Sequence, residues 1–172
     1  MKHLKPYDNT PSAFVVNCLK TISEVGSKLA LDLPCGYGRH SIFLKAAGYE
    51  VIAADINSEA LESIKTQNFN GQYIDATKEL PFAPNSFGLV VVVHYVQTGL
   101  IFNIARILVP GGYLIYETFG AHGENWKLLP QKDEILSELK GGYKTISLKE
   151  RPAGPKGSKR VSIKLYAQKL PF

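Results

Sequence analysis

The chain has 172 residues, of which 45% are hydrophobic and 20% charged, with 20 Lys and Arg against 15 Asp and Glu. This length suits one domain, and the globular composition excludes a disordered tail, a collagen-like rod and a disulfide-dense mini-scaffold. The positive charge is uneven: residues 1–139 carry 11 basic and 14 acidic side chains, whereas residues 140–172 carry nine basic and one acidic. A basic segment of this kind suits contact with nucleic acid or a membrane surface, or else a solvated face.

Neither a disulfide framework nor a membrane segment is expected. Cys18 and Cys35 are the only cysteines, and residues 1–8 lack the apolar run of a secretory signal. The longest apolar run, residues 89–93, is far shorter than the roughly 18–20 residues that span a bilayer. We therefore expect a cytoplasmic protein without a membrane partner.

Apolar runs alternate with amphipathic ones along the chain. Short apolar runs predict strands over 29–33, 50–54, 72–74, 88–94 and 113–118. Apolar residues spaced at three and four predict helices over 11–25, 39–47, 58–67, 98–108 and 132–139. Two last strands, over 143–148 and 161–168, are joined by a Gly/Pro turn over 152–158. This connection is too short for a crossover, so these two strands are expected to pair as an antiparallel hairpin.

Alternating βα units predict an α/β fold. We expect a doubly wound, Rossmann-like and mostly parallel sheet of seven strands, with helices on both faces and the antiparallel hairpin at the C-terminus. No internal repeat is evident, so residues 1–172 are expected to form a single domain. Its parts are an N-terminal helical segment (1–26), a cofactor-binding half (27–120) and a C-terminal half with a substrate-side loop and the hairpin (121–172).

The most informative segment is DLPCGYGRHS, residues 32–41, which follows the first predicted strand. Gly36 and Gly38 lie at a strand-to-helix turn, where a ligand can approach bare backbone and helix N-terminal amides. A dinucleotide fingerprint has a third glycine where Ser41 stands, which weakens the case for a nicotinamide cofactor.

Polar residues follow the other predicted strands. Asp55 lies 19 residues after Gly36, at the end of the second strand, where a carboxylate can accept from both hydroxyls of a ribose. Its alternative role is to begin the next helix. Asp75 is expected to end the third strand and suits either an adenine amine or a loop cap. His94 and Tyr95 end the fourth strand, where they either pack or contact a substrate.

On these residues the chain resembles class I S-adenosylmethionine-dependent methyltransferases, and among them the small tellurite-resistance type, over residues 29–168. The segments that carry the resemblance are ALDLPCGYGRHSIFLKAAGYEVIAADIN, FGLVVVVHYV, LVPGGYLIYETF, LLPQKDEILSEL and GGYKTISLKE. The resemblance implies S-adenosylmethionine as the cofactor. It implies that Asp32, Gly36 and Gly38 surround the methionine part, that Asp55 binds the ribose, and that Asp75 and Ala76 bind the adenine. The expected cofactor-binding residues are Asp32, Pro34, Cys35, Gly36, Gly38, Arg39, Asp55, Ile56, Asp75, Ala76 and His94.

Several positions in these segments depart from the usual family residue or allow a second role. Pro34 stands where the family has Gly or Ala, which removes a backbone donor, and Gly88 stands where an Asp is common. Cys35 is favoured as a small turn residue over a nucleophile, because no His is paired with it by spacing. Arg39 opens a helix against the helix dipole, which favours a nearby anion such as the cofactor carboxylate.

The leading hypothesis is therefore methyl transfer to a small-molecule acceptor, with a thiol or a metalloid oxyanion as the expected acceptor. No catalytic residue and no metal ligand is assigned. The alternatives are an NAD- or nucleotide-binding Rossmann module, and a cofactor-binding protein without catalysis. His122, Glu124 and Trp126 are candidates for one wall of the substrate pocket.

Lysines such as Lys144, Lys149 and Lys164 alternate with apolar residues in the predicted hairpin. This alternation favours a sheet edge guarded by lysine over a nucleic-acid-binding arm.

Overall fold

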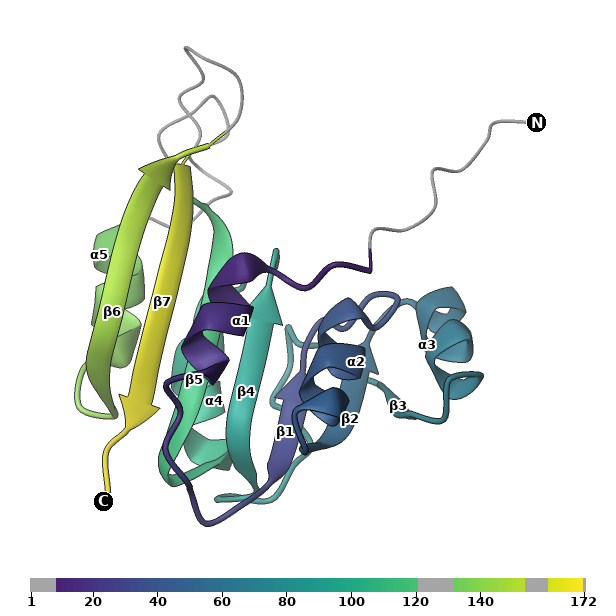
Figure 1. Ribbon diagram of the computed structural model, residues 1–172. Coiled ribbons are helices and arrows are strands. Elements are labelled where there is room, and N and C mark those ends of the chain that lie inside the picture. The colour runs from purple at the N-terminus through teal and green to yellow at the C-terminus, as the bar shows by residue number, and fades with distance from the viewer. Residues whose placement is uncertain (1–8, 121–131, 154–160, 172) are drawn as a thin grey trace.

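The structure is a computed structural model that describes residues 9–120, 132–153 and 161–171. Within these residues the strands form one sheet in the order β3-β2-β1-β4-β5-β7-β6 (Figure 1). The strands are β1 (Leu29–Asp32), β2 (Glu50–Asp55), β3 (Asn70–Tyr73), β4 (Phe87–Val93), β5 (Leu108–Gly120), β6 (Tyr143–Pro152) and β7 (Val161–Lys169). The helices are α1 (Ala13–Leu19), α2 (Arg39–Ala46), α3 (Ser58–Lys65), α4 (Leu100–Ile107) and α5 (Lys132–Leu139).

The expected seven-stranded α/β fold is confirmed. β1 pairs in parallel with β2 and β4, β2 with β3, and β4 with β5. The last two strands form the expected antiparallel hairpin, and β7 is also antiparallel to β5. The sequence pattern did not reveal that β7 lies between β5 and β6, so that β6, like β3, is an edge strand of the sheet.

The central strand β4 is buried along its whole length, as its apolar run predicts. Its side chains alternate between two layers. Leu89, Val91 and Val93 pack in the same cluster as residues of α1 and α2. Val90 and Val92 pack on the other face with residues of α4 and α5. Helices therefore cover both faces of the sheet.

The first helix is shorter than predicted. Ser12 caps α1, which ends at Leu19 rather than at residue 25. Thr21 closes the last turn, because its N–H and its hydroxyl donate to the Cys18 carbonyl at 2.9 and 2.8 Å. Ile22, expected on the helical stripe, lies beyond the helix but still packs against the core.

Two strand boundaries also differ from the prediction. β3 ends at Tyr73, so Asp75 lies two residues beyond the strand and not at its end. β5 begins at Leu108, because residues 110–112 (Pro-Gly-Gly) belong to the strand instead of preceding it. The predicted turn over 152–158 lies largely outside the described residues.

Gly88 has a packing reason. A Cβ built on it would overlap the Ser27 carbonyl oxygen and lie 2.8 Å from Val25 Cγ2. The Ser27 hydroxyl donates to the Ser86 carbonyl at 2.9 Å and accepts from the Leu29 N–H at 3.1 Å. The segment before β1 is thus fixed against the start of β4, and Gly88 leaves no space there for a side chain.

The lysines of the hairpin have two different environments. Lys144, Lys149 and Arg151 are exposed on the edge strand β6, as expected of a guarded edge. Lys164 contradicts the expectation, because it lies on the interior strand β7 and its ammonium contacts Glu117 Oε1 at 2.8 Å.

Among the described residues, the helices are too short or too polar to cross a membrane.

Candidate functional site

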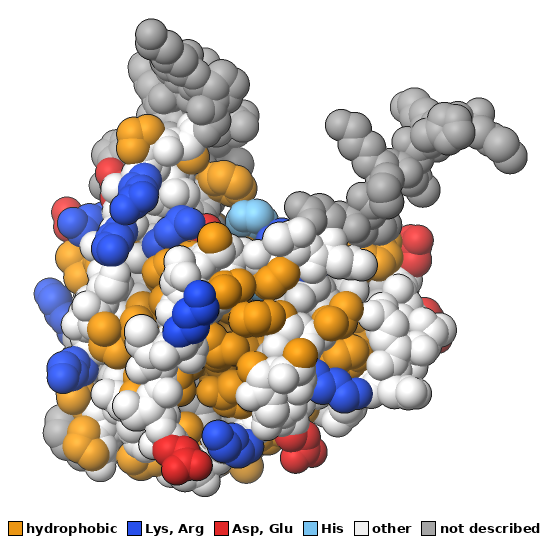
Figure 2. Space-filling view, in the orientation of Figure 1, with side chains coloured by type: hydrophobic (Ala, Val, Ile, Leu, Met, Phe, Trp, Pro, Cys, Tyr) orange, Lys and Arg blue, Asp and Glu red, His pale blue; other side chains and the backbone are white. Residues whose placement is uncertain are grey.

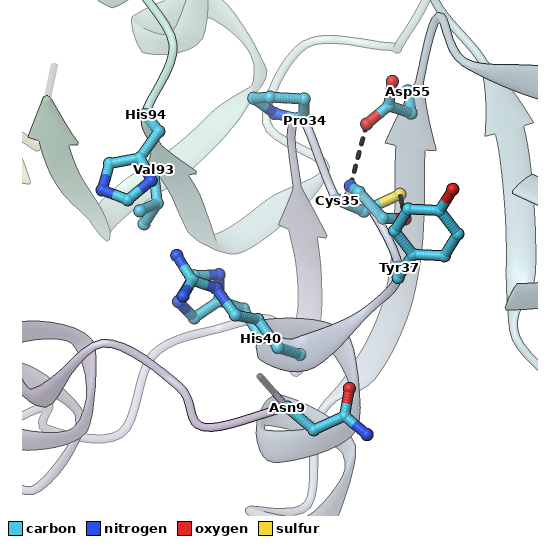
Figure 3. Close-up of a pocket in the computed structure, with 10 residues that line it drawn as sticks. Asn9, Pro34, Cys35, Tyr37, His40, Asp55, Val93 and His94 are labelled. Atoms are coloured by element: carbon cyan, nitrogen blue, oxygen red, sulfur yellow. Dashed lines mark hydrogen bonds between the residues drawn. The ribbon is translucent and has the colours of Figure 1, made fainter. Parts of the chain in front are cut away.

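A cleft with a volume of about 410 Å³ opens at the carboxyl ends of β1, β2 and β4 (Figure 3). In the sheet, β1 lies between β2 and β4, so the strand order reverses direction at β1. Open α/β sheets bind ligands at this switch point. The lining residues are Asn9, Pro34, Cys35, Gly36, Tyr37, Arg39, His40, Asp55, Val93 and His94. Figure 3 shows Asp55 and Tyr37 on one side of the cleft and Val93 and His94 on the other.

The turn after β1 presents its backbone to the cleft. Gly36 has a φ of 51°, and Gly38, which precedes α2, has a φ of 89°. These left-handed values favour glycine. A Cβ on Gly36 would meet no atom within 4 Å, so the backbone there borders open space. The turn therefore leaves room for a ligand against its main chain, as the glycine spacing predicts.

Asp55 is 7% exposed and ends β2. Its Oδ2 accepts from the Gly36 N–H at 2.8 Å, the dashed bond of Figure 3, and its Oδ1 accepts from the Asn57 N–H at 2.8 Å. Asn57 caps α3 by accepting from the N–H groups of Glu59 and Ala60. Because a carboxylate has about four acceptor positions, Asp55 can hold the turn and still accept from ligand hydroxyls.

Asp32 does not line the cleft and lies fully buried at the end of β1. The Ser41 hydroxyl donates to its Oδ2 at 2.6 Å, whereas its Oδ1 has no hydrogen-bond partner among the described residues. Burial raises the pKa of Asp32 to about 7, although the bond from Ser41 and the charge of Arg39 oppose the shift. An unpartnered buried oxygen favours a positively charged group close by.

Cys35 is a packed turn residue. Burial raises the pKa of its thiol well above the usual range, and the carboxylates of Asp32 and Asp55 add to the rise. Its side chain packs in one cluster with Ala53, Leu61 and Ile64. A thiol that stays protonated is a poor nucleophile, in agreement with the sequence-based interpretation.

His94 forms the far end of the cleft. It follows β4 in a left-handed backbone conformation, with a φ of 60°, which is uncommon outside glycine and recurs at functional sites. Its N–H donates to the Glu117 carbonyl at 2.8 Å. Its ring stacks on Phe119, with centroids 5.1 Å apart. The imidazole is therefore held in one position while remaining open to the cleft.

His40 lies deeper in the cleft wall, and its Nε2 accepts from the Ser12 N–H at 3.1 Å. Burial lowers the pKa of His40 to about 4, and the nearby Arg39 guanidinium lowers it further. Burial and Arg39 also lower the pKa of His94. Both imidazoles are consequently neutral at pH 7.

Glu117 connects the N-terminal segment to the C-terminal hairpin. Its carboxylate accepts from the Ser12 hydroxyl and from Lys164. Burial alone would raise the pKa of Glu117, but the bonds from Lys164 and Ser12 hold it below its usual value. The sequence pattern did not predict that Ser12 and Glu117 lie beside the site. Their contact depends on how α1 and β7 pack against β5, which that pattern does not show.

Three of the residues expected to bind the cofactor, Ile56, Asp75 and Ala76, do not line the cleft. Ile56 is 55% exposed just beyond β2, and Ala76 is buried. The Asp75 carboxylate accepts from the Thr77 N–H at 3.1 Å and from its hydroxyl at 2.6 Å, which is its alternative loop-capping role. The candidate wall residues 122, 124 and 126 lie outside the described residues. In the described part of the chain, no group of three or more His, Cys, Asp or Glu could hold a metal ion.

Comparison with known proteins decides the family. Residues 31–116 match a family described as the methyltransferase domain. The chain belongs to this methyltransferase family. The matched span contains every cleft-lining residue except Asn9. Membership confirms the broad family expected from the motifs and its cofactor, S-adenosylmethionine.

Two curated methyltransferases are similar in sequence. One, an uncharacterized methyltransferase of Synechocystis sp., is 31% identical over 121 residues, which are 65% of this chain and 56% of that protein. The other is a malonyl-[acyl-carrier protein] O-methyltransferase of Enterobacter lignolyticus. It is 27% identical over 136 residues, which are 66% of this chain and 54% of that protein. The chain thus spans about half the length of these curated relatives.

Solved structures of methyltransferases share the fold. A SAM-dependent methyltransferase from Methanosarcina mazei has a TM-score of 0.70 at 19% identity, covering 94% of this chain and 99% of that one. At this identity the likeness concerns the fold alone, and it agrees with the sheet order described above.

Proposed function

We propose that this chain transfers a methyl group from S-adenosylmethionine to a small-molecule acceptor in the cleft. The pairing of Gly36 with Asp55 carries the proposal. The Gly36 N–H, on a backbone that borders open space, donates to the buried carboxylate of Asp55 at 2.8 Å. This contact lies at the switch point of the sheet, in a chain of the methyltransferase family. The alternative from another class, a nicotinamide cofactor, is disfavoured because Ser41 stands at the third glycine position of the dinucleotide fingerprint.

The polar groups of the cleft match those of the cofactor. Asp55 would accept from the ribose hydroxyls, and the open turn at Gly36 leaves space for the methionine part. Arg39, which also lines the cleft, would pair with the cofactor carboxylate. Behind the cleft wall, the buried and unpartnered Oδ1 of Asp32 would favour the positively charged ammonium nearby. Beyond the cleft, Ile56 and the segment 75–76 are proposed for the adenine.

When bound, S-adenosylmethionine supplies a methyl group on a positively charged sulfur, which leaves as a neutral thioether. The task of the chain is to hold the acceptor in line with the breaking bond and to keep water out. His94 is neutral at pH 7 and borders the cleft, so it is the group suited to take a proton from an acceptor oxygen or nitrogen. A thiolate would need no such base.

The size of the cleft suits small-molecule ligands, and the acceptor would share the cleft with the cofactor. A volume of about 410 Å³ lies within the range of roughly 300–1,000 Å³ that is typical of small-molecule sites. A thiol or metalloid oxyanion as acceptor, and the tellurite-resistance subgroup, remain predictions from the resemblance. A nucleic acid acceptor remains the less favoured partner.

Calorimetric titration with S-adenosylhomocysteine tests the cofactor site. We expect wild-type protein to bind, and Asp55→Ala and Asp55→Asn to bind about 10- to 100-fold more weakly, because charge-assisted bonds to a ligand are worth roughly 1.5–3 kcal/mol. Glu50→Ala is the matched control, since Glu50 is an exposed acid at the other end of the same strand. Circular dichroism verifies that the Asp55 variants are folded. Wild-type protein that binds no S-adenosylhomocysteine contradicts the function, and unchanged affinity of folded variants contradicts the ribose assignment.

A further inference from the structure

The basic residues of the C-terminal hairpin line up beside the cleft. In antiparallel pairs, directly opposite residues project to the same face of the sheet. The register sets Lys164 opposite both Glu117 on β5 and Lys149 on β6. In the next row, Ser162 lies opposite Phe119 and Arg151. Lys149, Arg151 and Lys164 therefore share one face with Glu117 and Phe119, and we call these three cations the basic rim.

The basic rim lies on the face that borders the cleft. Lys164 contacts Glu117 and lies 5.5 Å from the centre of the Phe14 ring of α1. Phe119 stacks on His94, which lines the cleft. Figure 2 shows Lys and Arg side chains gathered over the upper part of the β6–β7 hairpin, with a histidine beside them near the upper edge of this face.

Little negative charge offsets the rim among the described residues. Glu117 shares its face and offsets the charge of Lys164, so Lys149 and Arg151 supply the net positive charge of the rim. Glu150, the one acid in residues 140–172, lies opposite Ile163, which packs in the core of the other face. His40 and His94 are neutral, and Arg39 adds a further cation to the cleft wall.

The rim is close enough to act on a ligand in the cleft. With strands about 4.8 Å apart, Lys149 on β6 lies two strands, or roughly 10 Å, from Glu117 and three strands, or roughly 14 Å, from the end of β4 that carries His94. The distance to His94 exceeds one Debye length at 0.1 M salt but is about half of the Debye length at 0.01 M, so the charge of the rim reaches the His94 end of the cleft at low salt.

We infer that the acceptor carries an oxyanion group, a carboxylate or a phosphate, which the basic rim draws to the His94 end of the cleft. The inference rests on the proposed methyl transfer and names the substrate class for it. It also gives a role to the charge concentrated in residues 140–172, beyond protection of a sheet edge.

Two anionic probes and one neutral analogue test the inference. Malonate, inorganic phosphate and malonamide are titrated by NMR into wild-type protein at about 10 mM ionic strength, with and without S-adenosylhomocysteine. Parallel additions of sodium chloride correct for salt. Saturable shifts of the His94 and Phe119 amides are expected with malonate, phosphate or both, and none with malonamide.

The double variant Lys149→Gln/Arg151→Gln removes two rim charges without touching the lining of the cleft. Loss of two unit charges at roughly 14 Å should weaken binding of each anion about two- to threefold at low salt, and less at 150 mM salt. Lys140→Gln/Lys144→Gln has the same net charge, lies outside the rim and should bind as wild type does. Response to malonate alone identifies a carboxylate, and response to phosphate alone identifies a phosphate.

The inference is overturned if neither anion shifts the cleft amides, if malonamide shifts them equally, or if the rim variant binds the anions as tightly as wild type. Failure of wild-type protein to bind S-adenosylhomocysteine counts instead against the proposed function. The two failures are distinguishable because the anions are also titrated without that ligand.

Discussion

Gly88 shows how one missing side chain fixes the position of two segments. Any Cβ at this position meets the backbone of Ser27, which cannot move freely because Ser27 is bonded to both Ser86 and Leu29. We expect Gly88→Ala to lower the free energy of unfolding by about 1–3 kcal/mol or more, because this is the usual cost of overpacking. Urea denaturation measures the change.

Gly26 provides the control for this prediction. A Cβ on Gly26 would meet nothing within 4 Å, and Gly26 has no positive φ. Gly26→Ala should therefore change stability by less than about 1 kcal/mol. Equal stability of the two variants would show that the close approach at Gly88 does not exist.

Asp32 makes stability depend on pH. Because its pKa is raised to about 7, the folded protein keeps a proton that the unfolded chain releases above about pH 4. The stability contributed by this proton is complete below pH 4 and is lost as the pH rises through 7. Relative to Asp32→Asn, the wild-type free energy of unfolding should fall by about 1.4 kcal/mol per unit between about pH 4 and 7.

Denaturation of both proteins in urea from about pH 4.5 to 8.5 measures this difference. His40 has a lowered pKa, so its contribution is lost as the pH falls from about 6.5 towards 4. It acts in both proteins and cancels in the comparison. A difference that stays constant with pH would mean that Asp32 is ionised throughout.

The residues of the site differ in how far the sequence predicts them. Gly36 and Asp55 could be found, because a glycine turn after one strand and an acid after the next must meet at the same edge of a parallel sheet. Asn9 carries no local signal, since it reaches the cleft only through the packing of α1. Tyr37 lies between Gly36 and Gly38, so its position in the turn could have identified it as a residue that lines the cleft.

At the scale of helices, α1 and α3 have caps of different kinds. Asn57 caps α3 only, whereas the Ser12 side chain caps α1 and also donates to Glu117. Ser12→Ala should cost about 2 kcal/mol, and Asn57→Ala about 1 kcal/mol, because only the first leaves a buried carboxylate with one partner fewer.

Hydrogen exchange localises the two effects. Amides of α1 should exchange faster in Ser12→Ala, and amides of α3 should do so in Asn57→Ala. If Ser12→Ala proves no more destabilising than Asn57→Ala, then the bond to Glu117 contributes nothing to the attachment of α1.

The order of the strands was predictable only in part. The alternation of strands and helices predicts the parallel part of the sheet, because each crossover returns the chain in the same direction. The hairpin could be inferred from its short connection. The position of the hairpin in the sheet, with β7 next to β5, could not be inferred. Alternation of polar and apolar residues shows which face of the sheet a side chain lies on, but not which strand lies beside it. Lys164 was therefore expected at an edge, although it bonds to Glu117 in the interior of the sheet.

For the molecule as a whole, the uneven charge has two consequences on the same strand. Lys149 and Arg151 belong to the basic rim beside the cleft, while Lys144 lies at the other end of β6. All three are exposed along the edge that β6 presents to solvent. An edge strand carries unpaired backbone groups, and lysines along it discourage pairing with a second copy. Protection of the edge and attraction of an anion are thus compatible.

The edge can be tested without reference to the cofactor. Lys144→Val/Lys149→Val removes two charges and raises the β-propensity of β6, so we expect association that increases with protein concentration. Size-exclusion chromatography with light scattering measures the mass over about a hundredfold range of concentration. Lys65→Val/Lys78→Val has the same change in charge away from this edge and should behave as wild type does. If both variants keep the wild-type mass at every concentration, lysine does not guard β6, and the basic rim remains the sole role of its charge.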